Sequence, residues 1–172
     1  MDCSVTLETL LNIFLLRHAE SPWSAHIDDH VRPLSDAGKT DALTLAKYIN
    51  DNNLVFDNVL CSSSNRTRDT LSIIKEYAPH LFQNVDYLED LYNASKETIL
   101  EVINKHNSFQ SLLAVGHNPG ISQLISELAG LEITDFPPCV LAHFTIDNDM
   151  DISSSQTLFI VKPENKEVIH LL

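Results

Sequence analysis

Three short apolar runs stand out along the chain, and each leads directly into polar, chemically active residues. The runs cover residues 12–16, 58–61 and 111–116. Runs of this length that contain few polar residues are typical of strands buried on both faces of a sheet. We therefore predict three buried strands, with a weaker fourth strand over residues 85–88.

The segments between these strands carry apolar residues at helical spacing. The periodic positions lie within residues 42–49, 67–78, 99–106 and 121–128. This spacing predicts four helices, one after each strand. Ser35 is a candidate N-cap of the first helix, and Asn118 is the predicted N-cap of the last, with Pro119 at its first position.

The last third of the chain has a different pattern. Residues 140–146 and 157–161 read as two more strands, joined by a polar loop, and we expect them to pair antiparallel. The whole pattern predicts an α/β protein: a three-layer α/β/α sandwich whose sheet is mainly parallel, with antiparallel strands near the C-terminus. Its length suits a single domain over residues 1–172.

The strand ends gather basic residues. In α/β sheets, ligands bind beyond the carboxyl ends of the strands. The first strand ends at Arg17-His18, the second is followed by Arg66, and the third ends at His117. Arg66 falls in a loop or the first turn of a helix, where a cation is unfavourable unless an anion lies nearby. We expect these four residues at one edge of the sheet.

The overall charge makes this cluster more informative. The chain carries 24 Asp and Glu against 11 Lys and Arg, a net charge of −13. Such a charge repels nucleic acids and anionic membranes, so we expect neither as a partner. A cluster of Arg and His must be held against this charge.

The cysteines indicate a compartment. Cys3, Cys61 and Cys139 are odd in number and widely spaced, which favours a reducing environment. The first residues lack a basic targeting segment, and the apolar stretch at 10–16 is too short to span a bilayer. We predict a cytoplasmic protein.

Two guanidinium groups and two imidazoles form a site suited to a tetrahedral dianion. Arginine contacts phosphate oxygens through permanently charged, bidentate hydrogen bonds. One imidazole can then attack phosphorus while the other stabilises charge in the transition state. An acid is still needed to protonate the leaving group.

The motifs around these residues resemble those of the histidine phosphatase superfamily, which has the phosphoglycerate-mutase-like fold. The matching segments are Leu16-Arg17-His18-Ala19-Glu20, Arg32-Pro33-Leu34-Ser35 with Gly38, Cys61-Ser62-Ser63 with Arg66 and Thr70, and Val115-Gly116-His117-Asn118-Pro119. The short chain and the Arg-Pro-Leu-Ser segment look most like the small SixA-type phosphohistidine phosphatases. Ala19 replaces the glycine of the family signature.

The resemblance implies a role for each residue. His18 would be the nucleophile that becomes phosphorylated, and Arg17, Arg66 and His117 would form the phosphate pocket. Arg32 would add a further contact. The family's proton donor is a carboxylate after the third strand, where Asp90 fits the pattern better than Glu89. The implied reaction uses no metal or other cofactor.

The substrate follows from the spacing of the motifs. The stretch between Arg66 and His117 is nearly used up by predicted helices and a strand. It leaves no room for the long lid insertions that enclose small substrates. We therefore hypothesise an open site for a phosphorylated side chain of a protein, phosphohistidine first, with a small phosphomonoester as the alternative.

Three other classes of protein fit the sequence less well. A cysteine phosphatase would need the motif Cys-x5-Arg, but Thr67 stands where that arginine would follow Cys61, and Arg66 is one position too early. A metallohydrolase could recruit His26, Asp28, Asp29 and His30, but the segment lacks a recognised ligand motif. A non-catalytic phosphate-binding module would keep both arginines and would not need His18.

Overall fold

The structure is a computed structural model that describes residues 10–106, 108, 110–133, 135–147 and 149–172. In this part of the chain seven strands form one sheet, in the order β3-β2-β4-β1-β5-β6-β7. The strands are β1 (Leu11–Arg17), β2 (Phe56–Ser62), β3 (Phe82–Leu88), β4 (Ser111–Gly116), β5 (Leu141–Ile146), β6 (Gln156–Glu164) and β7 (Glu167–His170).

The sheet is mixed. Strands β1 to β4 pair with each other in parallel, whereas β5 pairs antiparallel with β1, and β6 and β7 continue antiparallel from there. The predicted α/β class, with antiparallel strands toward the C-terminus, is confirmed. Strand β1 lies between β4 and β5, so its carboxyl end is surrounded by structure on both sides.

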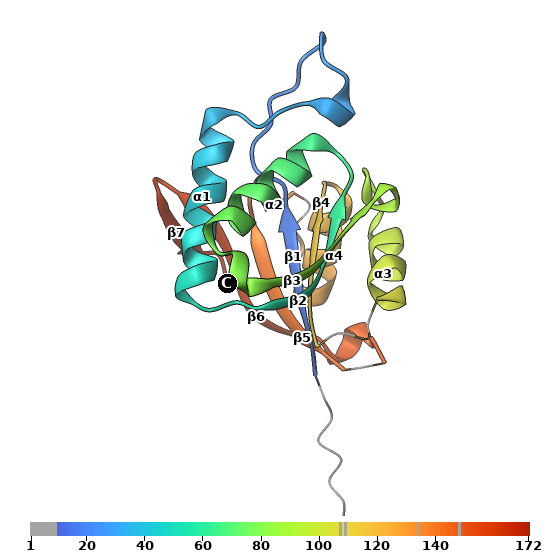
Figure 1. Ribbon diagram of the computed structural model, residues 1–172. Helices are drawn as coiled ribbons and strands as arrows, with labels where there is room; N and C mark the ends of the chain where they lie inside the picture. Colours follow the sequence, from blue (N-terminus) through green and yellow to red (C-terminus); the bar gives the residue numbers. More distant parts are fainter. Residues whose placement is uncertain (1–9, 107, 109, 134, 148) are drawn as a thin grey trace, which may run out of the picture.

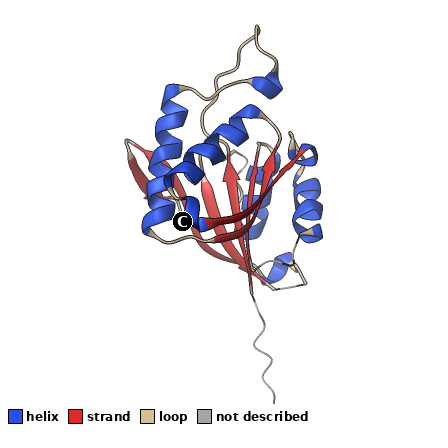
Figure 2. Cartoon of the chain, in the orientation of Figure 1, coloured by secondary structure: helices blue, strands red, loops and turns tan. Residues whose placement is uncertain are grey.

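Within the described residues, four α-helices cover the two faces of the sheet, an arrangement that can be followed in Figure 1. They are α1 (Asp36–Asp51), α2 (Asn65–Tyr77), α3 (Lys96–Lys105) and α4 (Gly120–Ala129). Short 3-10 segments occur at η1 (Asp29–Val31), η2 (Pro79–Leu81), η3 (Glu89–Leu91) and η4 (Ile152–Ser154). Figure 2 shows the twisted sheet between its two helical layers.

Strand β1 explains why the layers form on both sides. Its residues alternate between two cores: Ile13 and Leu15 pack with α3 and α4, whereas Phe14 and Leu16 pack with α1 and α2. All four side chains are buried. Successive side chains of a strand point to opposite faces, so an uninterrupted apolar run requires cover on both.

The capping predictions had different outcomes. Ser35 caps α1 as expected, since its hydroxyl accepts a hydrogen bond of 2.9 Å from the Gly38 backbone N–H. The Asn118 prediction is wrong: α4 begins at Gly120, and Pro119 precedes it. The Asn118 amide instead donates to the Phe136 carbonyl at 3.2 Å, which holds the segment before β5 against α4.

Strand β7 was not predicted. It is only four residues long and lies at the edge of the sheet, where its side chains are half-buried or exposed. A strand without a buried face carries no alternation of apolar and polar residues, so the sequence pattern contains no signal for it.

Some expectations fall outside the described structure or are not tested by it. Cys3 and the rest of residues 1–9 lie outside the described residues, and the single domain over residues 1–172 stays a prediction. Cys61 and Cys139 are buried free thiols. Among the described helices, none combines the length and the apolar character that crossing a bilayer requires.

Candidate active site

The carboxyl ends of β1, β2 and β4 bring the predicted residues to one cavity. These three strands are neighbours in the sheet. Arg17 ends β1, Arg66 lies in the first turn of α2 directly beyond β2, and His117 follows β4. A cavity of about 380 Å³ is lined by Arg17, His18, Glu20, Ser21, Asp29, Arg32, Arg66, Asn93, His117, Asn118 and Pro138.

The backbone of His18 is fixed from both sides. Its N–H donates to the Gly116 carbonyl at 3.1 Å, and its carbonyl accepts from the Cys139 N–H at 3.1 Å. The next residue, Ala19, donates its N–H to the Thr70 hydroxyl at 3.0 Å, which ties the loop to α2. The backbone of His18 is therefore anchored to both neighbouring strand ends and, through Ala19, to a helix.

The imidazole of His18 is held in one tautomer. Its Nδ1 lies 2.7 Å from the Ala19 carbonyl oxygen, and a carbonyl can only accept, so the proton is on Nδ1. The Arg66 Nε–H points at His18 Nε2 from 3.3 Å, which places the lone pair of His18 on Nε2. The imidazole of His18 is thus arranged to use Nε2 as a nucleophile.

The environment also keeps His18 neutral. Burial lowers its pKa to about 4, and the charges of Arg66, Arg17 and Arg32 add to this effect. Burial likewise lowers the pKa of His117 to about 2. Both imidazoles are uncharged near neutral pH, and an uncharged imidazole has the lone pair that nucleophilic attack needs.

Two buried nitrogen atoms at the cavity have no hydrogen-bond partner among the described residues. They are Nε of Arg17 and Nδ1 of His117. The other nitrogen of His117, Nε2, shares a hydrogen bond of 2.8 Å with the Ser62 hydroxyl. Buried polar atoms are almost always paired in folded proteins, so two unpaired ones beside a cavity suggest that a ligand completes them.

Asp29 holds Arg66 in place. Arg66 is only 2% exposed, and its Nη2 donates to Asp29 Oδ2 at 3.0 Å while Nη1 donates to the Asp29 backbone carbonyl at 2.5 Å. Asp29 also accepts from Arg32 Nε at 3.1 Å and from the Tyr92 hydroxyl at 2.7 Å. These contacts, led by the Tyr92 hydrogen bond, lower the pKa of Asp29 to about 2.

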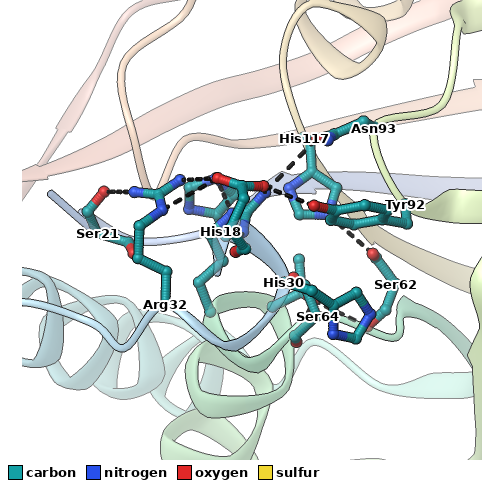
Figure 3. Close-up of polar contacts among 12 residues, drawn as sticks. His18, Ser21, His30, Arg32, Ser62, Ser64, Tyr92, Asn93 and His117 are labelled. Carbon is teal, nitrogen blue, oxygen red and sulfur yellow. Dashed lines mark hydrogen bonds and ion pairs between the residues drawn. The ribbon is translucent and has the colours of Figure 1, made fainter. Parts of the chain in front are cut away.

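Figure 3 shows this arrangement: Ser21 and Arg32 lie on one side, Tyr92 and Asn93 on the other, and His18 and His117 lie between them. Sequence reasoning placed Arg32 here through the Arg-Pro-Leu-Ser segment. It missed the role of Asp29, which it considered only as a metal ligand. The acidic pair Asp28-Asp29 shortly before Arg32 was the available signal.

The predicted proton donors lie outside the cavity lining. Asp90 is exposed in η3 and is not among the lining residues. Glu89 accepts a hydrogen bond from the Ser63 hydroxyl, and its Oε2 lies 3.6 Å from His30 Nε2. Two other carboxylates do line the cavity, Asp29 and Glu20, and Glu20 accepts from the Ser35 hydroxyl at 2.8 Å.

The alternative sites have different geometry. Cys61 is buried within β2, and burial raises its pKa to about 12, so it stays a thiol at neutral pH. Within the described residues, no group of three or more His, Cys, Asp or Glu side chains is arranged to hold a metal ion. Asp29, which that alternative would recruit, is paired with two arginines instead.

Comparison of the sequence with known proteins finds the same family. Residues 13–95 match the histidine phosphatase superfamily (branch 1). An uncharacterised protein of Mycobacterium tuberculosis strain H37Rv is 37% identical over 121 residues, which is 70% of this chain and 73% of that protein.

The structure has relatives among solved proteins. A candidate phosphohistidine phosphatase SixA from Agrobacterium tumefaciens superimposes with a TM-score of 0.77 at 28% identity, covering 89% of this chain and 99% of that one. The protein histidine phosphatase SixA complexed with tungstate has a TM-score of 0.76 at 20% identity, covering 89% and 97%. The chain therefore belongs to the histidine phosphatase superfamily, and its structure is similar to the SixA phosphohistidine phosphatases.

Proposed function

We propose that this phosphatase transfers a phosphoryl group from a phosphorylated side chain of a protein, phosphohistidine first, to His18 and then to water. The observation that carries the proposal is the neutral His18 with its lone pair on Nε2, in a cavity that also holds the unpaired nitrogens of Arg17 and His117. A phosphoryl group bound there would meet a nucleophile and hydrogen-bond donors together.

The reaction has two steps. In the first, His18 Nε2 forms a bond to phosphorus, and the bond to the leaving group breaks with its electron pair going to the leaving atom. Arg17, Arg66 and His117 contact the phosphoryl oxygens, and Arg32 adds positive charge nearby. In the second step water attacks the phosphorylated His18, the P–N bond breaks, and phosphate leaves.

The state of Asp29 supports phosphohistidine as the preferred substrate. Asp29 is held ionised by Arg66, Arg32 and Tyr92, so it cannot donate a proton near neutral pH. An alcohol leaving group needs such a proton, because an alkoxide is a very strong base. The imidazole of phosphohistidine needs much less help, because an imidazole ring is basic enough to carry the proton itself and to leave as a neutral group.

The surroundings of the cavity support a protein substrate. The chain between Arg66 and His117 is taken up by α2, β3, α3, β4 and two short 3-10 segments, with no insertion that could close over a small molecule. The SixA structure noted above is named a protein histidine phosphatase.

A small phosphomonoester remains the second candidate substrate. The reducing, cytoplasmic location stays a prediction from the sequence.

We expect His18→Ala to abolish hydrolysis of p-nitrophenyl phosphate, because the variant loses the Nε2 lone pair assigned to attack phosphorus, whereas His117 is assigned to a phosphoryl oxygen. The radiolabelled phosphoenzyme of the unmodified protein should be labile in acid and stable in alkali, as a phosphoimidazole is. His80→Ala is the matched control, since His80 is exposed in η2, and it should keep full activity. Turnover retained by His18→Ala, or an acid-stable adduct, would refute the nucleophile assignment.

The pH dependence of His18 follows from its burial. Its pKa of about 4 in the folded protein lies below the ordinary 6.5, so the imidazole stays neutral down to about pH 4. The contribution of His18 to the free energy of unfolding is complete above about pH 6.5 and declines as the pH falls toward 4. It declines because the His18 imidazole of the unfolded chain binds its proton at a higher pH than that of the folded protein. A ¹⁵N NMR titration, with His18→Ala for assignment, should place the transition near 4. A midpoint near 6.5 would contradict the burial argument.

The identity of the proton donor can be tested by comparing substrates that have different leaving groups. Asp90 is the candidate from sequence, and Glu20 is the cavity carboxylate that no arginine contacts among the described residues. We expect Glu20→Gln to lower kcat/KM for an alkyl phosphate by about 10²-fold, with little effect on a phosphohistidine peptide. Asp90→Asn should affect neither substrate. If Asp90→Asn instead shows the selective loss, Asp90 is the donor and Glu20 is not.

A further inference from the structure

We propose that the loop over residues 21–33 is a docking surface for the protein substrate, with Trp23 as its anchor, and that the substrate carries apolar and basic residues beside its phosphorylated side chain. We call this segment the docking loop. The proposal rests on the proposed function, which it deepens by naming the partner surface. Figure 1 shows the segment rising beyond the carboxyl end of β1.

The docking loop is closed at its base. The Ser21 hydroxyl donates to the Pro33 carbonyl at 2.7 Å, and Arg32 Nη1 donates to the Ser21 carbonyl. Just outside the loop, the Ser35 N–H donates to the Glu20 carbonyl at 3.0 Å. Closed loops of this length with their ends tied together are compact units that frequently carry function.

One side of the docking loop belongs to the active site. Asp29 pairs with Arg66, and the Val31 carbonyl accepts a hydrogen bond of 3.1 Å from Asn65 in the first turn of α2. Ser21, Asp29 and Arg32 line the cavity. The loop is thus held against the phosphate site, and a surface that is already positioned loses little conformational freedom on binding.

The loop also exposes apolar side chains that the fold does not use. Trp23 is 76% exposed, Val31 is 49% exposed and Ile27 is 42% exposed. Trp23 is only two residues from Ser21 in the cavity lining, so it lies within about 7 Å of it along the chain. Tryptophan is among the residues that most often anchor protein interfaces.

The charge around the cavity indicates which partner fits. Asp28 is exposed on the loop, and the side chains of Glu89 and Asp135 are 71% and 73% exposed near the same edge, where Asp135 also pairs with Arg17 at 3.1 Å. With a net charge of −13, the protein repels a free phosphate dianion. A phosphorylated side chain flanked by arginine or lysine overcomes this repulsion and complements the carboxylates. The same charge disfavours a second copy of this chain as the occupant.

The test uses two peptides that carry a non-hydrolysable phosphoryl-triazole analogue of phosphohistidine. One has Leu and Arg on both sides of the analogue, and the other has Gly and Ser. Their affinities are measured by fluorescence anisotropy of a dye on the peptide, with inorganic vanadate as the probe of the phosphate site alone. Hydrolysis of p-nitrophenyl phosphate is measured in parallel.

We expect Trp23→Ala to weaken binding of the Leu/Arg peptide about tenfold, as truncation of an interface tryptophan typically does. Binding of the Gly/Ser peptide and of vanadate should change less than twofold. Tyr77→Ala is the matched control. Tyr77 is an exposed aromatic residue at the C-terminal end of α2, the opposite end of the helix from Arg66. This variant should bind both peptides and vanadate as the unmodified protein does. An equal loss for both peptides and vanadate, or no loss at all, would overturn the proposal.

Two further readouts come from the unmodified protein. Trp23 is its only tryptophan, so its emission should shift to shorter wavelength with the Leu/Arg peptide and stay unchanged with vanadate. Raising the salt concentration from about 0.05 to 0.5 M should weaken binding of the Leu/Arg peptide more than binding of the Gly/Ser peptide. An unchanged Trp23 emission, or self-association that Trp23→Ala removes, would contradict the docking role.

The failure of the docking proposal is distinguishable from the failure of the proposed function. If the protein does not hydrolyse p-nitrophenyl phosphate but binds the Leu/Arg peptide through Trp23, the catalytic proposal fails and the docking surface stands. If hydrolysis occurs and the two peptides bind equally, the docking surface fails and the phosphatase proposal stands.

Discussion

The ion pair between Asp29 and Arg66 connects the main parts of this protein. Arg66 is 2% exposed, and a charged side chain so buried would be very unfavourable without a partner; Asp29 supplies one through both its side chain and its backbone. The pair positions Arg66 with its Nε toward His18. It also holds the loop over residues 21–33 against the cavity, so one contact organises both the phosphate site and the surface around it.

The chemistry depends on keeping charge off the two imidazoles. Burial and nearby arginines leave His18 and His117 neutral, and the Ala19 carbonyl selects the tautomer of His18 that has its lone pair on Nε2. The arginines therefore have two effects: they attract the phosphoryl group, and they keep the nucleophile unprotonated. A protein with a net charge of −13 achieves this only because the cluster is local and buried.

The sequence predicted most of the fold and the core of the candidate site, because both depend on strong local signals. Strand β1 must be buried on both faces, and residues that follow parallel strands must share an edge, so Arg17, His18 and His117 could be located from the pattern alone. Asp29 and Trp23 could not, since they lie in an irregular loop whose conformation is set by contacts with Arg66 and Asn65 far along the chain. The capping role predicted for Asn118 was wrong because its amide contacts a segment distant in sequence.

The central claim is that this edge of the sheet binds a phosphoryl group in line with His18. The most direct measurement is a crystal structure with bound vanadate, which mimics the transferred group. The account predicts that vanadium lies within bonding distance of His18 Nε2 and that vanadate oxygens accept hydrogen bonds from Arg17 Nε and His117 Nδ1. Vanadate bound elsewhere on the protein, with those two atoms still unpaired, would contradict it.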